Sequence, residues 1–426
     1  MGRMPLPGSR SAGRLALFVL AGLAAPAALA AQVQEAVFEI AATPVATNRL
    51  GWSVDLSGIY AVATSPGQHD GMTGYLYVYR RAGTSWVQEQ VFKGASTDAG
   101  DWLGIDVAID GDVIVGGGYG VSDGPDGTPG YHRGAAWVFR RVGGTTPWVE
   151  EARLQPATLL EHDGFGRAVG VSGGLIVAGA TGVDERGDES GAAYVFRYSA
   201  GAWNEEARLT AFDGGAHQRF GSAVAASGDT LAIGAEGTME ADGFSGAVYV
   251  YRFDGATWGL EQRLATPGGA RDDRFGAALD LAGDVLVVGA PRELAAGQPK
   301  AGRVHVYRRS GGVWSEEAAL QAATPRTADN FGGSVSLSSD QLLAGVQGDD
   351  GSGPSAGLAC HFRRTGGLWS LHATFTGSSV DTADGFGRSL AIDGDLAIVG
   401  APHAIIEAVA KYGRAYLFSG LLGGAP

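Results

Sequence analysis

A repeated unit of four short apolar runs constrains the fold of this chain more than any other feature. One copy contains Phe220–Ala226, Leu231–Ala235, Ala247–Tyr251 and Trp258–Leu264. Each run has the length of a strand, is rich in β-branched or aromatic residues, and is separated from the next by turn residues. A single antiparallel sheet of this size cannot bury both of its faces, so it needs neighbours of its own kind. The unit therefore predicts an all-β repeat protein.

The unit occurs seven times along the chain. Its first run opens on Phe-Gly or Leu-Gly, its second ends on Gly-Ala-Pro or a relative of it, and its fourth opens on Trp in six copies. The spacings between the opening glycines are 53, 62, 55, 55, 56 and 55 residues. The copies begin at Leu50, Leu103, Phe165, Phe220, Phe275, Phe331 and Phe386.

The seventh copy lacks a fourth run, and the missing strand lies near the N-terminus. Gln32–Phe38 matches Trp86–Phe92 at five of seven positions. A strand from about residues 32–41 would complete the last blade and pair two otherwise open edges, which closes a ring. A linear solenoid would instead need capping repeats at both ends. We therefore predict a seven-bladed β-propeller of four-stranded antiparallel blades, formed as a single domain by residues 31–426.

Phe-Gly at the start and Gly-Ala-Pro at the end of a strand pair resemble the FG-GAP repeat, the unit of the integrin α-subunit propeller. The resemblance covers all seven copies and implies the propeller fold, which hosts many unrelated functions. Many family members hold calcium between the first and second strands, where six to eight oxygens are needed. Here that connection is a tight turn such as Ser227–Asp229, with one or two carboxylates. We therefore transfer no metal site and expect no cofactor; calcium stays an alternative that these turns do not support.

The first thirty residues have the pattern of a secretory signal peptide. Three arginines precede the apolar run Leu15–Leu23, and Ala28–Ala30 supplies small residues for cleavage. The apolar run is short for a membrane span. We expect a secreted, periplasmic or cell-surface protein with no membrane span in the mature chain.

The net charge and the cysteine count exclude one class of partner and one kind of crosslink. The net charge of −14 leaves no basic surface to displace the counterions of nucleic acid, so we exclude nucleic acid as a partner. Cys360 is the only cysteine, so no intrachain disulfide can form. Its position in the third run of its repeat favours a small buried side chain over a reactive thiol.

The long loops indicate the face on which binding would occur. In a four-strand blade, the loops from strand two to three and the links between blades share one face, and here these are long and differ in every repeat. We expect an extracellular protein or glycan to bind there. The candidate ligand-binding residues in these loops are Asp123, Asp126, Tyr131, His132, Asp184, Glu185, Arg186 and Asp188.

A polar residue stands two positions before each Phe-Gly or Leu-Gly. Five of the seven are aspartates, namely Asp101, Asp163, Asp273, Asp329 and Asp384. In a ring they could form an acidic collar at the mouth of the channel and attract a cation. The alternative, which we favour, is that each side chain caps its own turn by accepting backbone N–H groups.

The sequence lacks the common catalytic motifs. It has no G-x-S-x-G elbow, no His-Glu-x-x-His and no phosphate loop, and its eight histidines form no metal-spaced cluster. We therefore assign no catalytic residue and favour a non-enzymatic scaffold for binding, adhesion or protein interaction. The alternative is a secreted polysaccharide hydrolase or lyase with its site in the same loop face. A His–Tyr pair or two paired acids at the central pocket would favour the enzyme.

Overall fold

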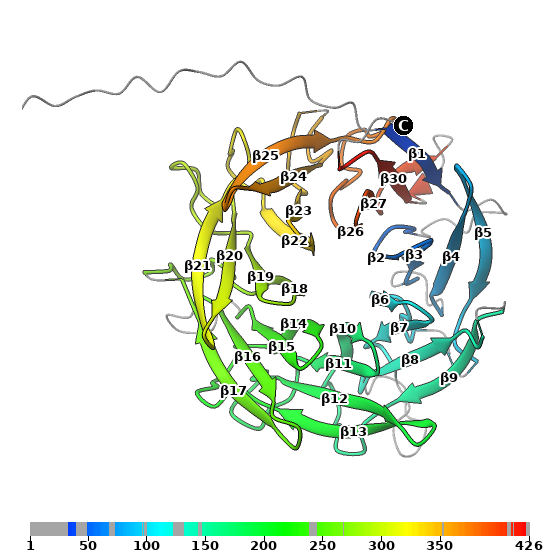
Figure 1. Ribbon diagram of the computed structural model, residues 1–426, viewed down its shortest axis with the longest axis vertical. Coiled ribbons are helices and arrows are strands. Elements are labelled where there is room, and N and C mark those ends of the chain that lie inside the picture. Colours follow the sequence, from blue (N-terminus) through cyan, green and yellow to red (C-terminus); the bar gives the residue numbers. More distant parts are fainter. Residues whose placement is uncertain are drawn as a thin grey trace, which may run out of the picture. The chain divides into compact units, whose positions relative to one another are not determined.

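The protein is a ring of seven four-stranded antiparallel sheets, which confirms the predicted propeller (Figure 1). The computed structural model describes residues 33–39, 49–67, 73–95, 97, 100–121, 132–143, 147–237, 245–266, 268–351, 353–406, 410–411 and 413–422. The predicted signal peptide lies outside this range. Across the described ranges there is no helix, and hence none that is long and apolar enough to cross a membrane.

The two strands nearest the channel differ in burial. The second strands are buried along their whole length: β3 (Tyr60–Ser65), β7 (Val113–Gly118), β11 (Leu175–Ala180), β15 (Thr230–Ala235), β19 (Val285–Ala290), β23 (Gln341–Val346) and β27 (Leu396–Ala401). The innermost strands are partly accessible: β2 (Val54–Ser57), β6 (Asp106–Asp110), β10 (Phe165–Ser172), β14 (Phe220–Ser227), β18 (Ala278–Ala282), β22 (Phe331–Ser338) and β26 (Leu390–Asp393).

The outer half of each blade is a pair of antiparallel strands, which forms a hairpin in the first six blades. The third strands are β4 (Tyr75–Ala82), β8 (Ala135–Arg140), β12 (Ala192–Ser199), β16 (Ala247–Phe253), β20 (Arg303–Ser310), β24 (Leu358–Thr365) and β30 (Arg414–Ser419). The outermost are β5 (Ser85–Phe92), β9 (Val149–Leu154), β13 (Ala202–Leu209), β17 (Trp258–Leu264), β21 (Val313–Leu320), β25 (Leu368–Phe375) and β1 (Val33–Phe38). A short pair, β28 (Ile405–Ile406) and β29 (Ala410–Lys411), extends one loop.

The Phe-Gly and Gly-Ala-Pro motifs meet between neighbouring blades. Gly221 has a φ of 91°, and a Cβ on it would lie 2.4 Å from the carbonyl oxygen of Ala192 in the preceding blade. A Cβ on Gly179 would lie 1.9 Å from the carbonyl oxygen of Gly221. Side chains therefore cannot fit at either position. The Phe or Leu that opens each copy, such as Phe220, is fully buried and contributes about 1.5–3 kcal/mol by leaving water.

The N-terminal strand closes the ring as predicted. β1 pairs with β30, with Val33 opposite Ser419 and Phe38 opposite Ala415. On the channel side, Asp393 of the seventh blade accepts a hydrogen bond of 2.7 Å from the backbone N–H of Gly58 in the first. Comparable contacts of Ser or Asp with the next blade recur in most copies, for example between Ser172 and Gly228. These bonds satisfy backbone N–H donors of the tight turns between the first and second strands.

The recurring Trp and Glu residues connect blades at the rim. Glu151 accepts hydrogen bonds from Arg140 of its own blade at 2.7 Å and from the indole of Trp203 in the next at 2.8 Å. Glu206 pairs with Arg197 of its own blade at 2.9 Å. Glu261 pairs instead with Arg309 of the next blade, at 3.0 Å.

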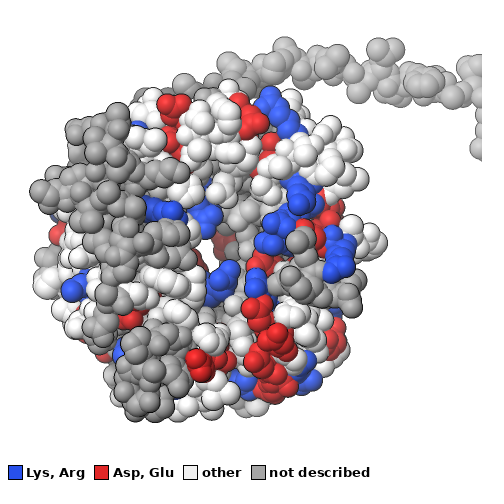
Figure 2. Space-filling view, turned by 180° about the vertical axis from the view of Figure 1, so that it is seen from behind, with Lys and Arg blue, Asp and Glu red and all other residues white. Residues whose placement is uncertain are grey.

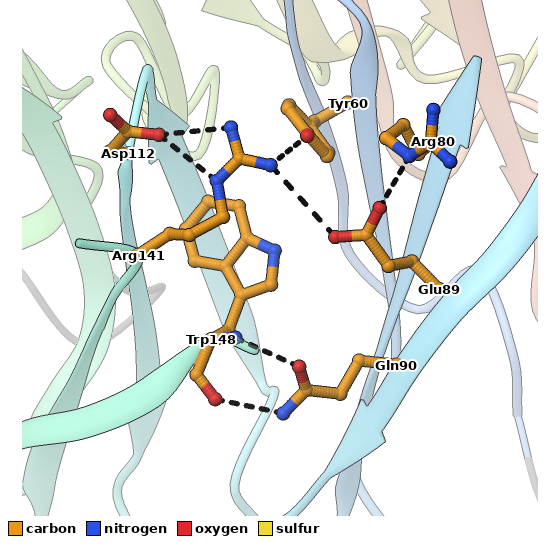
Figure 3. Close-up of polar contacts among 7 residues, drawn as sticks. All are labelled: Tyr60, Arg80, Glu89, Gln90, Asp112, Arg141 and Trp148. Carbon is orange, nitrogen blue, oxygen red and sulfur yellow. Dashed lines mark hydrogen bonds and ion pairs between the residues drawn. The ribbon is translucent and has the colours of Figure 1, made fainter. Parts of the chain in front are cut away.

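The first two blades show such a junction in detail (Figure 3). Arg141 of the second blade donates to Asp112 and to the hydroxyl of Tyr60 in the first. The side-chain amide of Gln90 exchanges two hydrogen bonds of 2.9 Å with the backbone of Trp148. The blades are therefore joined by polar contacts as well as by apolar packing.

Cys360 is buried, as predicted, with 1% of its surface exposed. Burial raises the pKa of its thiol to about 12, which disfavours the reactive thiolate.

Candidate functional site

The channel through the ring opens on the long-loop face as a cavity of about 670 Å³. Its wall includes residues from all seven innermost strands. The residue that follows each Phe-Gly or Leu-Gly faces it in every blade: Trp52, Ile105, Arg167, Ser222, Ala277, Gly333 and Arg388. The repeat therefore delivers seven side chains, unlike in chemistry, to one place.

Three aspartates of this channel, Asp55, Asp106 and Asp280, are held by backbone N–H groups. Asp55 accepts hydrogen bonds from its neighbour Leu56 at 2.8 Å and from Ile109 of the next blade at 2.7 Å. Asp280 bridges two blades in the same way. Burial raises the pKa of Asp55 to about 8, although these hydrogen bonds oppose the shift. The side chains stay partly accessible from the channel, and their contacts indicate a structural role.

Arginine side chains border the mouth of the channel on this face (Figure 2). Arg388 lies flat against Trp52, with its Cζ 4.0 Å from the centroid of the ring. Arg49 lies over the same ring at 5.4 Å. Arg167 approaches the ring of Tyr119 at 5.6 Å. The mouth therefore combines cations with aromatic faces, an arrangement suited to planar anions.

A second cavity of about 280 Å³ adjoins the first and shares Tyr119 and Arg167 with it. We call it the aromatic pocket; it is lined by Trp102, Tyr119, His132, His162, Gly164, Arg167, Thr181, Gly182, Glu189 and Arg219. The Trp102 ring stacks on His132 with centroids 5.6 Å apart, and His162 lies 5.9 Å beyond His132.

Left-handed backbone conformations aim these side chains into the aromatic pocket. Trp102, His132, His162 and Arg219 have φ values of 59°, 39°, 68° and 57°. Such conformations are uncommon for residues other than glycine and cost free energy, so they persist only where the surrounding structure imposes them. Three of these residues, Trp102, His162 and Arg219, lie in turns that lead into an innermost strand, and His132 precedes the third strand β8.

Of the eight predicted ligand-binding residues, the structure places His132 in the aromatic pocket. Asp123, Asp126 and Tyr131 lie outside the described residues. The other four belong to one exposed loop, where Asp184 accepts a hydrogen bond from the backbone of Glu189 and Glu185 pairs with Arg208. The side chains of Arg186 and Asp188 contact neighbouring loops.

The five aspartates of the predicted collar are buried, with 2–5% of their surface exposed. Four of them accept a hydrogen bond from the backbone N–H three residues earlier, at 2.6–2.8 Å; they are Asp163, Asp273, Asp329 and Asp384. These are the contacts of the turn-capping interpretation. Burial raises the pKa of each of the four.

The sequence analysis did not identify most of the residues that line the channel and the aromatic pocket, although their positions relative to the repeat motif could have indicated them. In three copies the residue directly before Phe-Gly or Leu-Gly lines the aromatic pocket, namely Trp102, Gly164 and Arg219, and in every copy the residue directly after lines the channel. Aligning those two positions across the seven copies would have identified Arg167 and Arg388. Among the described residues, no group of three potential metal ligands lies close together.

The comparison with protein-family models agrees with this architecture. A family model described as FG-GAP repeat matches residues 148–196, 203–251, 258–307, 314–359 and 369–418, more than half of the chain. Among solved structures, the crystal structure of Sqt1 from Saccharomyces cerevisiae aligns with a TM-score of 0.47 and 10% sequence identity, over 86% of this chain and 82% of that one. No curated protein matches the chain. Since the matched segments recur with the period of the blades, the chain belongs to the FG-GAP repeat family.

Proposed function

We propose that this protein is an exported, non-enzymatic binding propeller that engages an extracellular protein or glycan through its long-loop face. The observation that carries the proposal is the pair of adjoining cavities at the channel mouth. An FG-GAP propeller is in general a fold suited to interaction scaffolds. Concave sites with aromatic walls and a few polar groups are typical of ligand binding.

The rigidity of the ring supports binding on this face. Blades are joined by interlocking glycines, by buried Phe and by rim contacts, so loops between them are held on a fixed frame. A preorganised site loses less conformational entropy when a ligand binds. The short turns on the opposite face offer fewer side chains for recognition.

The test is a binding screen of the mature protein against an array of glycans and against extracellular proteins, followed by matched variants. Trp102→Ala removes an aromatic wall of the pocket, and Asp229→Ala changes an exposed turn on the opposite face. We expect the first to weaken binding about 10-fold or more and the second to leave it unchanged. Equal effects of both variants would contradict the placement of the site.

A second candidate function, a polysaccharide lyase, is favoured by the approach of His132 and His162 to Tyr119 and Arg167. In such a reaction a base removes the proton next to a sugar carboxylate, the C–O bond to the neighbouring sugar breaks, and the leaving oxygen receives a proton. An arginine would stabilise the charge that develops on the carboxylate. Release of unsaturated sugars, followed by ultraviolet absorbance and abolished by His132→Ala, would establish it and exclude a purely binding role.

A further inference from the structure

The guanidinium of Arg388 is the most unusual polar group at the channel mouth. It is packed on the Trp52 ring at 4.0 Å, and its buried Nε has no hydrogen-bond partner within the described part of the chain. Buried donors in native proteins are almost always paired, because an unpaired one loses its hydration without compensation. An acceptor supplied by a ligand would complete the hydrogen bonding of this side chain.

The charges around Arg388 are of its own sign. Burial, followed by the nearby Arg49 and Arg167, lowers the pKa of Arg388 to about 10. Three cations from blades one, three and seven therefore converge on one opening, although the whole chain carries a net charge of −14. An anion bound between them would relieve this repulsion and form charge-assisted hydrogen bonds.

The acidic groups of the same cavity do not provide that anion, because they are already bound. Glu236 lies 3.7 Å from Arg274, a different arginine of the wall. Asp106 accepts hydrogen bonds from Ser53 at 3.0 Å and from the backbone of Val169 at 2.9 Å. Among the described residues, these groups therefore leave Arg388 and Arg167 without an acidic partner.

The aromatic pocket adds a second requirement for the ligand. It begins at Arg167, next to the positive mouth, and offers the rings of Trp102, Tyr119 and His132. Aromatic faces pack against the C–H groups of sugar rings, while an arginine binds a planar carboxylate or a sulfate through paired N–H groups. An acidic side chain of a peptide would accept hydrogen bonds from the arginines, but it would leave the aromatic rings of the pocket without a packing partner.

We infer that the channel mouth binds an acidic oligosaccharide, with a carboxylate or sulfate at Arg388 and Arg167 and an adjoining sugar ring in the aromatic pocket. This inference rests on the proposed function, since it names the ligand class of the same face. It adds that recognition depends on an anion and on a site built from blades that are far apart in sequence.

The experiment is calorimetric titration of the mature protein with a uronic acid oligosaccharide, a sulfated one, a neutral one of equal length, and an acidic peptide. Arg388→Gln and Arg167→Gln remove the proposed anion contacts, and Arg388→Lys keeps the charge without the planar donor pair. Arg326→Gln is the control, because Arg326 is a half-exposed arginine elsewhere in the ring. Thermal unfolding of each variant separates loss of binding from loss of folding.

We expect Arg388→Gln and Arg167→Gln each to weaken binding of an acidic oligosaccharide about 10- to 100-fold, with Arg326→Gln unchanged. Whichever of the uronate and sulfate ligands binds identifies the anion. Equal binding of the neutral sugar and no effect of Arg388→Gln would overturn this inference while the proposed function stood. Equal binding of the acidic peptide would overturn the sugar assignment, and absence of any glycan or protein ligand would overturn both proposals.

Discussion

His361 is a buried histidine at a position that the other blades fill with an aliphatic residue, and its replacement gives the sharpest prediction from this structure. It lies in β24 with none of its surface exposed. The corresponding residues are Val78, Val138, Val195, Val250, Val306 and Leu417, all equally buried. Neither ring nitrogen of His361 has a hydrogen-bond partner among the described residues. We therefore expect His361→Val to stabilise the protein.

The expected gain can be estimated from the burial of the imidazole. Leaving a buried polar group unpaired costs about 1–3 kcal/mol, and valine has a similar volume and no polar atom. For a domain of roughly 400 residues the entropy of unfolding is about 0.8 kcal/mol per kelvin, so this gain raises Tm by about 1–4 °C at neutral pH.

The same substitution should remove an acid sensitivity. Burial, helped by the nearby His372 and Arg363, lowers the pKa of His361 from its ordinary value of 6.5 to about 3. The unfolded chain therefore binds a proton that the folded protein does not, and stability falls as pH drops from about 6.5 towards about 3. At about pH 5 this difference contributes about 2 kcal/mol to the destabilisation of the native protein, and the valine variant lacks it.

Differential scanning calorimetry of both proteins at about pH 7 and about pH 5 measures these effects. His162→Asn is the control, since the His162 side chain is largely exposed and asparagine tolerates its left-handed φ of 68°. The reasoning is refuted if His361→Val fails to raise Tm, or if the gain is the same at both pH values. A proton titration of His361 near its ordinary pKa, observed by NMR, would refute it as well.

Three further substitutions test other contacts. Burial lowers the pKa of His305, but hydrogen bonds to Glu293 at 2.7 Å and Glu316 at 3.0 Å outweigh it and raise the pKa above the usual value. We expect His305→Gln to lower the free energy of unfolding below about pH 6.5 and to matter less as pH rises through the native pKa; a pH-independent loss would contradict this. Asp273→Ala should cost about 1–3 kcal/mol in urea denaturation by uncapping a turn, with Asp273→Asn milder and cation affinity unchanged. Glu261→Ala should cost about 1–3 kcal/mol, because two donors of the next blade lose their acceptor, and an unchanged midpoint would show that this rim contact is dispensable.

The ring itself could be predicted because its information is local and repeated seven times. The predicted run Trp258–Leu264 coincides with β17, and the others of that copy differ from the observed strands by one or two residues at their ends. The match of Gln32–Phe38 with a fourth strand located β1 correctly, since a strand needed to complete a blade keeps the pattern of its equivalents.

Other features were decided only by the tertiary structure. Glu261 has its partner Arg309 in the next blade, whereas Arg252 of its own blade donates a hydrogen bond to Thr230. Sequence spacing shows which residues share a strand, but not which of two neighbouring sheets a long side chain reaches.

The sequence by itself determined the number of blades, the order of strands, the closure of the ring and the face that carries the long loops. It did so because strand periodicity and glycine positions are set by backbone geometry. The candidate site, in contrast, is assembled only by the tertiary structure. The left-handed backbone at Trp102 and Arg219 directs these two side chains into the aromatic pocket. Closure of the ring brings Arg388 of the last blade beside Trp52 of the first. Residues more than 300 positions apart thus share one cavity, and the reason is the curvature of the ring rather than any local motif.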